Sequence, residues 1–175
     1  YHEYLKKISF LGKIYRKFFL FPFLRLKTGP RFVDLGCGIG EFLSYGDKES
    51  VGLDNNIFNI NFLRDNHLNG YHIKDDGIFP LSDNSFEVVI SDQVLEHIVD
   101  PRKFISEIKR ILKKGGKIII GVPCKRGFQI DPDHKVFYEL DNLKDLFLSD
   151  TKISIIDYFY FPFPLKIFGK FIKIQ

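Results

Sequence analysis

One strand-to-loop junction constrains the fold of this 175-residue chain more than any other feature. Residues 31–35 form a short run rich in β-formers, and the glycine-rich stretch 36–40 (GCGIG) follows directly. Glycine adopts positive φ at little cost and has no Cβ, so such a loop lets the backbone approach a ligand closely. Residues 41–45 can begin a helix behind the loop. The junction therefore predicts a strand–loop–helix unit with a ligand site at the loop.

The segments after this junction alternate between strand-like and helix-like patterns. We expect strands at 50–53, 71–74, 86–90, 117–122 and 152–160, and helices at 58–67, 101–114 and 140–148. Gly70 is expected to close the first of these helices, and Pro101 to open the second. This alternation predicts an α/β fold, namely a three-layer αβα doubly wound and mostly parallel sheet. Ligands of such sheets bind beyond the carboxyl ends of the strands.

Two carboxylates at strand ends indicate what the ligand carries. Asp34 lies two residues before the first glycine, where it would repel a pyrophosphate but would suit an amino group. Asp54 follows the second strand, where a carboxylate can accept hydrogen bonds from both hydroxyls of a ribose. The glycine spacing is G-x-G-x-G, and Glu41 stands where the dinucleotide fingerprint needs a glycine. These residues count against a dinucleotide ligand.

Several downstream segments resemble the class I methyltransferase family that uses S-adenosylmethionine. The segments that carry the resemblance are 75–81 (DDGIFPL), 83–89 (DNSFEVV), 94–98 (VLEHI) and 110–116 (RILKKGG). They are similar to the family's loop after its third strand, its entry to strand four, its "vLeHv" element and its "R-x-L-k-p-G-G" element. Glu87 and Lys114 replace the usual Asp and Pro. The resemblance covers roughly residues 31–148 and is to type-11 methyltransferase domains.

The resemblance implies a binding site for S-adenosylmethionine, with S-adenosylhomocysteine as the product. Asp34 would lie near the methionine amino group, the glycines under the methionine and ribose, and Asp54 at the ribose diol. Asp75 and Asp76 would meet the adenine edge, and residues 91–93 would leave strand four beside the sulfonium. The residues expected to bind the cofactor are Asp34, Gly36, Cys37, Gly38, Gly40, Asp54, Asn55, Asp75, Asp76, Ser91, Asp92 and Gln93.

Two histidines are candidates for work on the methyl acceptor. His97 lies in the "EH" element, where a structural role is favoured over catalysis. His134 lies in the segment 131–135 (DPDHK), which resembles the "D-H-x-x-F" stretch of branches that methylate sugars or lipid-linked glycans. An oxygen or nitrogen acceptor can need a base, so His134 is the predicted general base.

Both ends of the chain are basic and rich in phenylalanine, whereas the middle is acidic. Residues 1–31 carry a net charge of +7, residues 151–175 carry +3, and residues 32–150 carry −6. The spacing of apolar residues predicts a basic amphipathic helix over 4–19 that ends before Pro22. We assign residues 1–30 to this helix, either as a lid over the cofactor or as a membrane-surface contact. Residues 31–175 are assigned to the S-adenosylmethionine-binding methyltransferase domain.

The C-terminal end departs from the family's pattern, which finishes with two strands in a reversed hairpin. Residues 152–160 supply one strand, and the tail 165–175 (LKIFGKFIKIQ) is either a short last strand or a basic amphipathic helix. A shortened sheet would expose an edge that needs cover, so a homodimer stays an open alternative.

No metal is expected, because Cys37 and Cys124 form no CxxC pair and no histidine cluster stands at metal-ligand spacing. Two widely separated cysteines fit a reducing compartment. Neither a spanning helix nor a signal peptide is expected, so the chain is interpreted as cytoplasmic, with peripheral membrane contact as an open alternative. The missing initial Met indicates that residues precede Tyr1.

The expected function is S-adenosylmethionine-dependent methyl transfer to a small-molecule or a lipid- or glycan-linked acceptor. Two alternatives stay open: a nicotinamide or nucleotide-sugar oxidoreductase, and an inactive cofactor-binding partner protein. Nucleic acid is not favoured as a substrate, because residues 91–94 (SDQV) show no Asn-Pro-Pro-Tyr-like element for base methylation. The basic ends leave an RNA substrate open.

Overall fold

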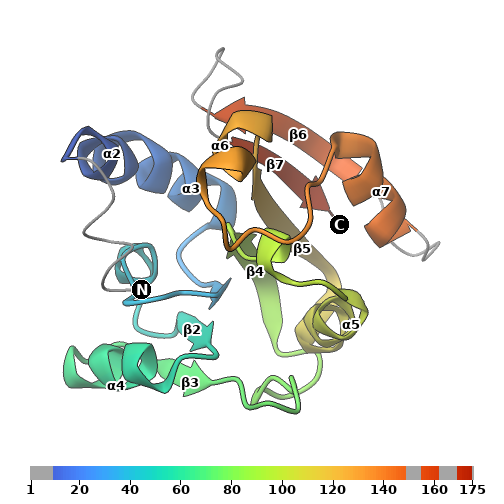
Figure 1. Cartoon of the computed structure of the whole chain (residues 1–175). Coiled ribbons are helices and arrows are strands. Elements are labelled where there is room, and N and C mark those ends of the chain that lie inside the picture. Colours follow the sequence, from blue (N-terminus) through green and yellow to red (C-terminus); the bar gives the residue numbers. More distant parts are fainter. Residues whose placement is uncertain (1–9, 149–154, 162–168, 175) are drawn as a thin grey trace.

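The computed structural model describes residues 10–148, 155–161 and 169–174. Its seven strands form one sheet in the order β3-β2-β1-β4-β5-β7-β6 (Figure 1). The strands are β1 Val33–Leu35, β2 Val51–Asp54, β3 Gly70–His72, β4 Phe86–Asp92, β5 Leu112–Pro123, β6 Ile155–Phe161 and β7 Gly169–Ile174. Strands β1 to β5 run parallel, and β7 is antiparallel to both of its neighbours, β5 and β6. The predicted α/β fold class is confirmed.

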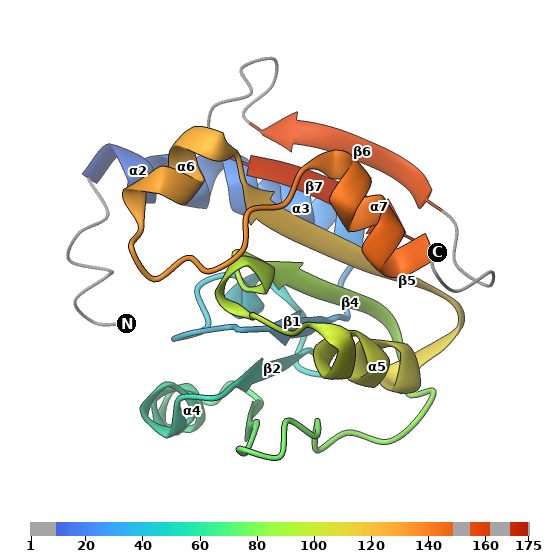
Figure 2. The ribbon, with the colours of Figure 1, turned by 45° about the vertical axis from the view of Figure 1, so that its right-hand side comes forward.

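Helices cover both faces of the sheet, so the molecule has three layers (Figure 2). The α-helices are α2 Phe10–Tyr15, α3 Phe21–Thr28, α4 Ile57–Asp65, α5 Arg102–Ile111, α6 Lys125–Ile130 and α7 Leu140–Leu148. The shorter pieces are the π-helix η1 Arg16–Leu20 and the 3₁₀ turns η2 Leu43–Tyr45 and η3 Leu95–His97. Helices α5 and α7 pack on one face of the sheet, and α3 and α4 pack on the other.

The alternation of side chains along the central strands produces these two packed faces. Val89 packs with the α5 and α7 side chains, whereas its neighbours Val88 and Ile90 pack with α3 and α4. On β5, Ile118 faces the α5 layer and Ile119 faces the α3 layer. A parallel strand that is buried on both faces reads as a continuous apolar run. This is why the sequence predicted β4 and β5 from apolar runs alone.

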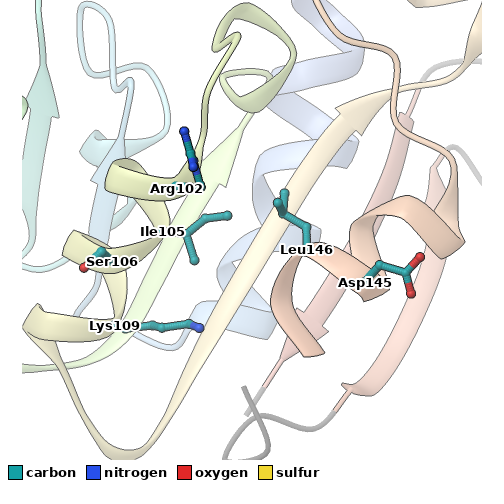
Figure 3. Close-up of a pocket in the computed structure, with 6 residues that line it drawn as sticks. All are labelled: Arg102, Ile105, Ser106, Lys109, Asp145 and Leu146. Carbon is teal, nitrogen blue, oxygen red and sulfur yellow. The ribbon is translucent and has the colours of Figure 1, made fainter. Parts of the chain in front are cut away.

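A hollow of about 370 Å³ lies between α5 and α7 (Figure 3). Its lining consists of side chains from these two helices, namely Arg102, Ile105, Ser106, Lys109, Asp145 and Leu146. None of them is a predicted cofactor or acceptor residue. The hollow therefore belongs to the packing of the helix layer and not to the ligand edge of the sheet.

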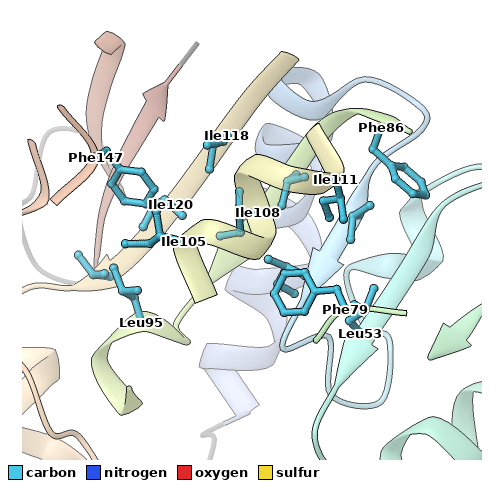
Figure 4. Close-up of a cluster of buried hydrophobic side chains, with 14 of the residues drawn as sticks. Leu53, Phe79, Phe86, Leu95, Ile105, Ile108, Ile111, Ile118, Ile120 and Phe147 are labelled. Atoms are coloured by element: carbon cyan, nitrogen blue, oxygen red, sulfur yellow. The ribbon is translucent and has the colours of Figure 1, made fainter. Parts of the chain in front are cut away.

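Helix α5 shows how the sequence pattern becomes packing. Ile105, Ile108 and Ile111 recur at intervals of three, which places them on one side of a helix. All three are buried, with exposed fractions of 5%, 0% and 0%. Figure 4 shows these side chains gathered between β5 and Phe79. Arg102 and Lys103 of α5 are exposed, whereas Glu107 is buried with the apolar stripe.

The predicted end of the N-terminal helix before Pro22 is wrong. Helical backbone continues from Phe10 through η1 to the end of α3 at Thr28. In the π-helical turn the N–H of Phe21 donates to the carbonyl of Arg16, and Pro22 falls in the first turn of α3. Proline is tolerated there, because the wider π-helical turn interrupts the regular i→i−4 bonding just before the residue that has no N–H to donate. Residues 4–9 of the predicted helix lie outside the described residues.

Three further local predictions differ from the structure. Residues 112–114, expected at the end of the helix 101–114, belong to β5, because α5 ends at Ile111. Helix α4 ends at Asp65, and His67 adopts the left-handed conformation (φ 59°) that was expected of a glycine. Gly70 instead begins β3, where a Cβ would lie only 2.9 Å from Leu63 Cδ1. The helix expected at 41–45 is reduced to the turn η2. Glycine therefore marks close packing at Gly70 and does not cap the helix.

The sheet is not shortened at its C-terminal edge, because two antiparallel strands complete it. Residues Gly169–Ile174 of the tail form β7 between β5 and β6, so the helical interpretation of this segment is wrong. Residues 162–168 and Gln175 lie outside the described residues. Because both antiparallel strands are present, the sheet itself gives no reason for a second copy, and the homodimer stays a prediction.

Among the described helices, none is long and apolar enough to cross a membrane.

The burial of α5 predicts a specific loss of stability. Ile108→Ala should lower the free energy of unfolding by about 2–5 kcal/mol, because the residue is fully buried and the substitution leaves a cavity. The matched control Ile130→Ala changes a residue that is 74% exposed and should shift stability by about 0.5 kcal/mol or less. Urea unfolding followed by circular dichroism measures both. Equal losses in the two variants would contradict the assigned packing.

Candidate functional site

The loops after β1, β2 and β4 meet at the same edge of the sheet. Parallel pairing places Leu35 beside Leu53 on β2 and beside Ser91 on β4. The chain leaves all three strands at their carboxyl ends, which is where such sheets bind ligands. The structure therefore brings the glycine loop, Asp54 and residues 91–93 together, as the sequence predicted.

Three positions of the loop require glycine, because their backbone conformation or close packing disfavours a side chain. Gly36, Gly38 and Gly40 have φ of 69°, 55° and 80°, in the left-handed region that disfavours side chains. A Cβ on Gly36 would overlap the side chain of Val94, and one on Gly40 would overlap Leu63. The N–H of Gly36 donates to the carbonyl of Leu53 on β2 (2.7 Å), which fixes the start of the loop.

Cys37 contributes backbone rather than a side chain to this loop. Its thiol is 6% exposed and packs in the apolar cluster that also holds Leu43 and Leu63. Burial raises the pKa of the thiol, so it stays protonated. The side chain therefore faces the core and not the ligand edge.

Asp54 ties the glycine loop to the loop after β2. Its Oδ2 accepts the N–H of Gly38 (2.9 Å) and its Oδ1 accepts the N–H of Asn56 (2.8 Å). The carboxylate is 8% exposed. Asn55 beside it is exposed, and its carbonyl oxygen contacts His72 Nε2 at 2.9 Å. Asp54 is thus held rigidly by backbone donors and keeps further lone pairs for a ligand.

Asp75 and Asp76 lie in the turn after β3, and both are exposed. Asp76 Oδ1 accepts the N–H of Ile78 (3.0 Å), and Gly77 (φ 66°) completes the turn with a 2.8 Å bond to the carbonyl of Lys74. This placement leaves the carboxylate of Asp75 open to a ligand from solvent.

The segment that follows this turn is anchored by residues that the sequence did not assign. Arg110 Nη2 donates to the carbonyl of Phe79 (2.8 Å), and its Nη1 donates to the carbonyl of Leu81 (2.7 Å). The N–H of Phe79 donates to Glu107 Oε2 (2.8 Å), and Arg110 lowers the pKa of this carboxyl. The arginine of the "R-x-L" motif was the available signal, and its function is to hold the loop after β3.

Residues 91–93 leave β4 with polar atoms turned inward. Ser91 Oγ and Asp92 Oδ1 are buried and, within the described parts of the chain, have no hydrogen-bond partner. Gln93 is exposed and takes a positive φ of 58°, with its N–H bonded to the carbonyl of Gly121 (2.9 Å). Buried polar atoms without partners are rare in folded proteins, so these two call for a ligand or water.

The site carries an excess of negative charge. Burial, reinforced by the charges of Asp92 and Asp54, holds the pKa of Asp34 well above its usual value. Burial also raises the pKa of Asp92 to about 6, although Arg16 and Gln93 lower it. Carboxylates that raise one another's pKa are stabilised by a cationic ligand.

Arg16 reaches this site from the N-terminal helix. Its Nη2 lies 3.1 Å from Glu41 Oε2, and its charge lowers the pKa of both Asp34 and Asp92. A second hollow, of about 520 Å³, lies between the helix and the loop; it is lined by Lys13, Arg16, Lys17, Phe21, Glu41, Ser44 and Tyr45. The sequence had treated Arg16 only as part of a basic face.

A second polar cluster lies at the same edge, formed by Glu96, His97 and His134. Glu96 is fully buried, and burial raises its pKa to about 8. His134 Nε2 lies 3.8 Å from Glu96 Oε1, and the two imidazole rings are 4.8 Å apart. The backbone carbonyl of Glu96 accepts the N–H groups of Lys135 (2.7 Å) and Val136 (3.0 Å). These bonds join η3 to the segment after α6 and bring residues far apart in sequence into contact.

Comparison with known proteins agrees with this architecture. A family model described as a methyltransferase domain matches residues 33–120. An uncharacterised protein of Methanocaldococcus jannaschii is 34% identical over 139 residues, which are 74% of this chain and 58% of that protein. The mitochondrial ubiquinone biosynthesis O-methyltransferase of Dictyostelium discoideum is 32% identical over 118 residues, 53% of this chain and 35% of that protein. The chain spans less than two thirds of either relative's length.

A solved structure shows the same fold. The crystal structure of an S-adenosylmethionine-dependent methyltransferase from Aquifex aeolicus aligns with a TM-score of 0.71 at 17% identity, over 99% of this chain and 96% of that one. The family match runs from β1 into β5 and includes the glycine loop, Asp54 and residues 91–93. The chain therefore belongs to the methyltransferase domain family, among the type-11, class I S-adenosylmethionine-dependent methyltransferases.

Proposed function

We propose that this chain transfers the methyl group of S-adenosylmethionine to a small-molecule or a lipid- or glycan-linked acceptor. The observation that carries the proposal is the set of three carboxylates around a glycine loop: Asp34 and Asp54 are buried, and Asp92 is half-buried with its Oδ1 inside. The cofactor has an amino group and a sulfonium, so its positive charges suit these carboxylates. A nicotinamide dinucleotide would instead bring a negatively charged pyrophosphate to them.

The roles of the cofactor-binding residues follow from this fit. Gly36, Gly38 and Gly40 lie under the methionine and ribose, and Asp34 faces the amino group. Asp54 accepts hydrogen bonds from the ribose diol, because each of its oxygens has one backbone donor and a lone pair left. When bound, the cofactor supplies a methyl group already activated by its sulfonium. The chain's own residues then mainly align an acceptor in line with that group.

The remaining predicted residues lie around the rest of the cofactor. Asp75 and Asp76 meet the adenine edge from the turn after β3, with Asn55 beside the ribose. Ser91 Oγ and Asp92 Oδ1, both buried, line the channel beside the sulfonium. Cys37 contributes its backbone only, since its thiol is in the core.

The N-terminal helix acts as a lid in this proposal. Phe21 and Leu24 of α3 are buried against the sheet, and Phe21 packs on Phe42 with ring centroids 5.6 Å apart. These contacts hold the helix where Arg16 reaches the acidic site. The outer side of the same helix leaves Phe18 and Phe19 about 60% exposed. An exposed aromatic pair beside basic residues supports contact with a membrane surface.

The acceptor side is the edge where the second polar cluster lies. His134 Nδ1 lies 2.9 Å from the carbonyl of Phe128, and a carbonyl only accepts, so Nδ1 carries the proton. Its Nε2 therefore keeps the lone pair that the predicted general base requires. The Dictyostelium relative, by its name, methylates an oxygen. An oxygen acceptor fits a site with a proton-accepting group of this kind.

Loss of Asp54 or Asp75 should weaken cofactor binding. In calorimetric titration with S-adenosylhomocysteine, Asp54→Ala should raise Kd at least tenfold, which is about 1.4 kcal/mol, because it removes the ribose acceptor. Asp75→Ala should also weaken binding without lowering stability, since this carboxylate is exposed. Asp65→Ala, an exposed aspartate of α4, is the matched control and should bind as the wild type does. Folded wild-type protein that fails to bind S-adenosylhomocysteine would refute the proposed function.

The pKa of Asp92 predicts a pH dependence that separates the two forms of the cofactor. Below pH 6 Asp92 is mostly protonated and neutral; above it the carboxylate is ionised and attracts the sulfonium. The ratio of S-adenosylmethionine to S-adenosylhomocysteine affinity should therefore rise about tenfold from pH 5 to pH 7, since the ionised fraction rises by that factor. Asp92→Asn should remove the rise. A wild-type ratio that stays constant over this range would show that Asp92 does not face the sulfonium.

His134→Ala should abolish turnover and leave cofactor binding intact. An acceptor screen with S-adenosylmethionine labelled in the methyl group, run on phenols, sugars and polyprenyl phosphates, should show transfer by the wild type. The variant should lose a factor of about 10²–10⁴ in rate, with an unchanged Kd for S-adenosylhomocysteine. Loss of both properties would assign His134 a structural role instead. A wild type that binds the cofactor and labels no acceptor would favour the inactive partner protein.

A further inference from the structure

The second polar cluster contains a buried carboxylate that nothing in the described chain satisfies. Glu96 has an exposed fraction of 0%, and neither of its carboxylate oxygens has a hydrogen-bond partner among the described residues. His134 Nε2 is 3.8 Å from Glu96 Oε1 and thus too far for a hydrogen bond. A buried carboxyl without partners is costly to ionise, and a bound cation would stabilise its ionised form.

Each of the two histidines keeps one ring nitrogen for a ligand. His134 Nδ1 donates to the carbonyl of Phe128 (2.9 Å), and His97 Nδ1 donates to the carbonyl of Asp133 (3.2 Å). A carbonyl oxygen cannot donate, so both rings carry their proton on Nδ1 and have a free lone pair on Nε2. An Nδ1–H bonded to a backbone carbonyl is the usual outer contact of a metal-ligating histidine, because it fixes the tautomer and the ring.

We infer that Glu96, His97 and His134 bind a divalent first-row transition-metal ion through one carboxylate oxygen and two Nε2 nitrogens. One ligand atom from each residue lies within 4.8 Å of the others. Metal–nitrogen and metal–oxygen bonds are about 2.0–2.2 Å long, so a small closing movement brings all three onto one ion. The backbone bonds from Lys135 and Val136 to Glu96 already hold the two contributing segments together.

The donor set selects the kind of ion. Two imidazoles and one carboxylate suit Mn²⁺, Fe²⁺, Co²⁺ or Zn²⁺, whereas Mg²⁺ and Ca²⁺ prefer oxygen ligands. Three protein ligands leave coordination positions open for water or a substrate. The sequence predicted no metal because it considered only ligand spacing along the chain. These ligands come from two segments that only folding brings together.

The position of the site gives the ion a function, which rests on the proposed methyl transfer. Asp92, the residue assigned to the sulfonium, ends β4, and Glu96 lies in η3 directly after that strand, so the two sites are neighbours. An acceptor hydroxyl that binds the ion is oriented toward the methyl group and loses its proton to water more readily. The oxygen–carbon bond then forms while the carbon–sulfur bond breaks, and the electron pair of that bond returns to sulfur. The substrate class is therefore an acceptor whose hydroxyl can coordinate a divalent cation.

This inference changes the role of His134. A lone pair that holds a cation cannot also take up a proton, so His134 acts as a ligand and the ion activates the acceptor. The role of His97 differs too, since a structural residue was expected there. The two interpretations differ in a property that can be measured without any acceptor, namely the binding of the metal alone.

The test is titration of tag-free, metal-stripped full chain with Co²⁺, followed by calorimetry and by visible absorption. We expect one Co²⁺ per chain with ligand-field bands, and at least tenfold weaker binding by Glu96→Gln and by His97→Asn. His97 is exposed, so its substitution leaves the core untouched and guards against misfolding as the cause. His67→Asn is the matched control, because His67 is exposed, lies outside the cluster and has a positive φ that asparagine accepts. It should bind Co²⁺ as the wild type does.

Two outcomes would overturn the metal site: no Co²⁺ binding by the folded wild type, or binding that Glu96→Gln and His97→Asn leave unchanged. Titration of the same samples with S-adenosylhomocysteine separates this failure from that of the proposed function. Retained cofactor binding without Co²⁺ binding would sink the metal site alone. Bound Co²⁺ without cofactor binding would sink the proposed methyl transfer and leave the metal site standing.

Discussion

The carboxylate of Asp54 is the contact on which the ligand edge of this sheet depends. It accepts one backbone N–H from the glycine loop and one from the loop after β2. The carboxylate therefore fixes these two loops relative to each other. Hydrogen bonds to an ionised acceptor are stronger than neutral ones. The left-handed glycines make the geometry available, but the carboxylate holds it. The bonds of Gly36 and Cys37 to the carbonyl of Leu53 fix the start of the loop, and Asp54 fixes its middle at Gly38.

Negative charge around this contact creates a second constraint. Burial already disfavours the ionised forms of Asp34 and Asp92, and the charge of Asp92 makes the ionisation of Asp34 harder still. Arg16 offsets part of this cost from outside the parallel sheet. A cationic ligand would offset more of it, since it can lie between the carboxylates. The site thus combines a rigid backbone with carboxylates whose charge is only partly compensated. This arrangement is expected of a cofactor pocket and not of a packed core.

Local sequence patterns predicted the helices and strands whose formation depends on residues close together in the chain. The strand–glycine junction, the buried runs of β4 and β5, and α7 could be read directly because their burial follows a short period. Pro22 and Gly70 misled the prediction, because their meaning depends on tertiary context. A π-helical turn accommodates the proline, and close packing against Leu63 explains the glycine. Local propensity therefore failed where a contact or an unusual helical turn decided the backbone.

Contacts across long stretches of sequence were the other part that could not be predicted. Arg110 holds the carbonyl of Phe79 from 31 residues away, and Glu96 contacts a histidine 38 residues further along the chain. In both cases the two residues lay in segments that the sequence analysis had recognised, but the contact between them was not visible. Glu96 is the more informative case, since Glu96 and His97 are adjacent in sequence and spacing along the chain reveals no further ligand near them. Here the third donor arrives with the segment after β5, and the backbone of Glu96 itself binds that segment. Glu96 therefore positions His134 through its backbone carbonyl, and its carboxylate is one of the three ligands of the proposed metal ion.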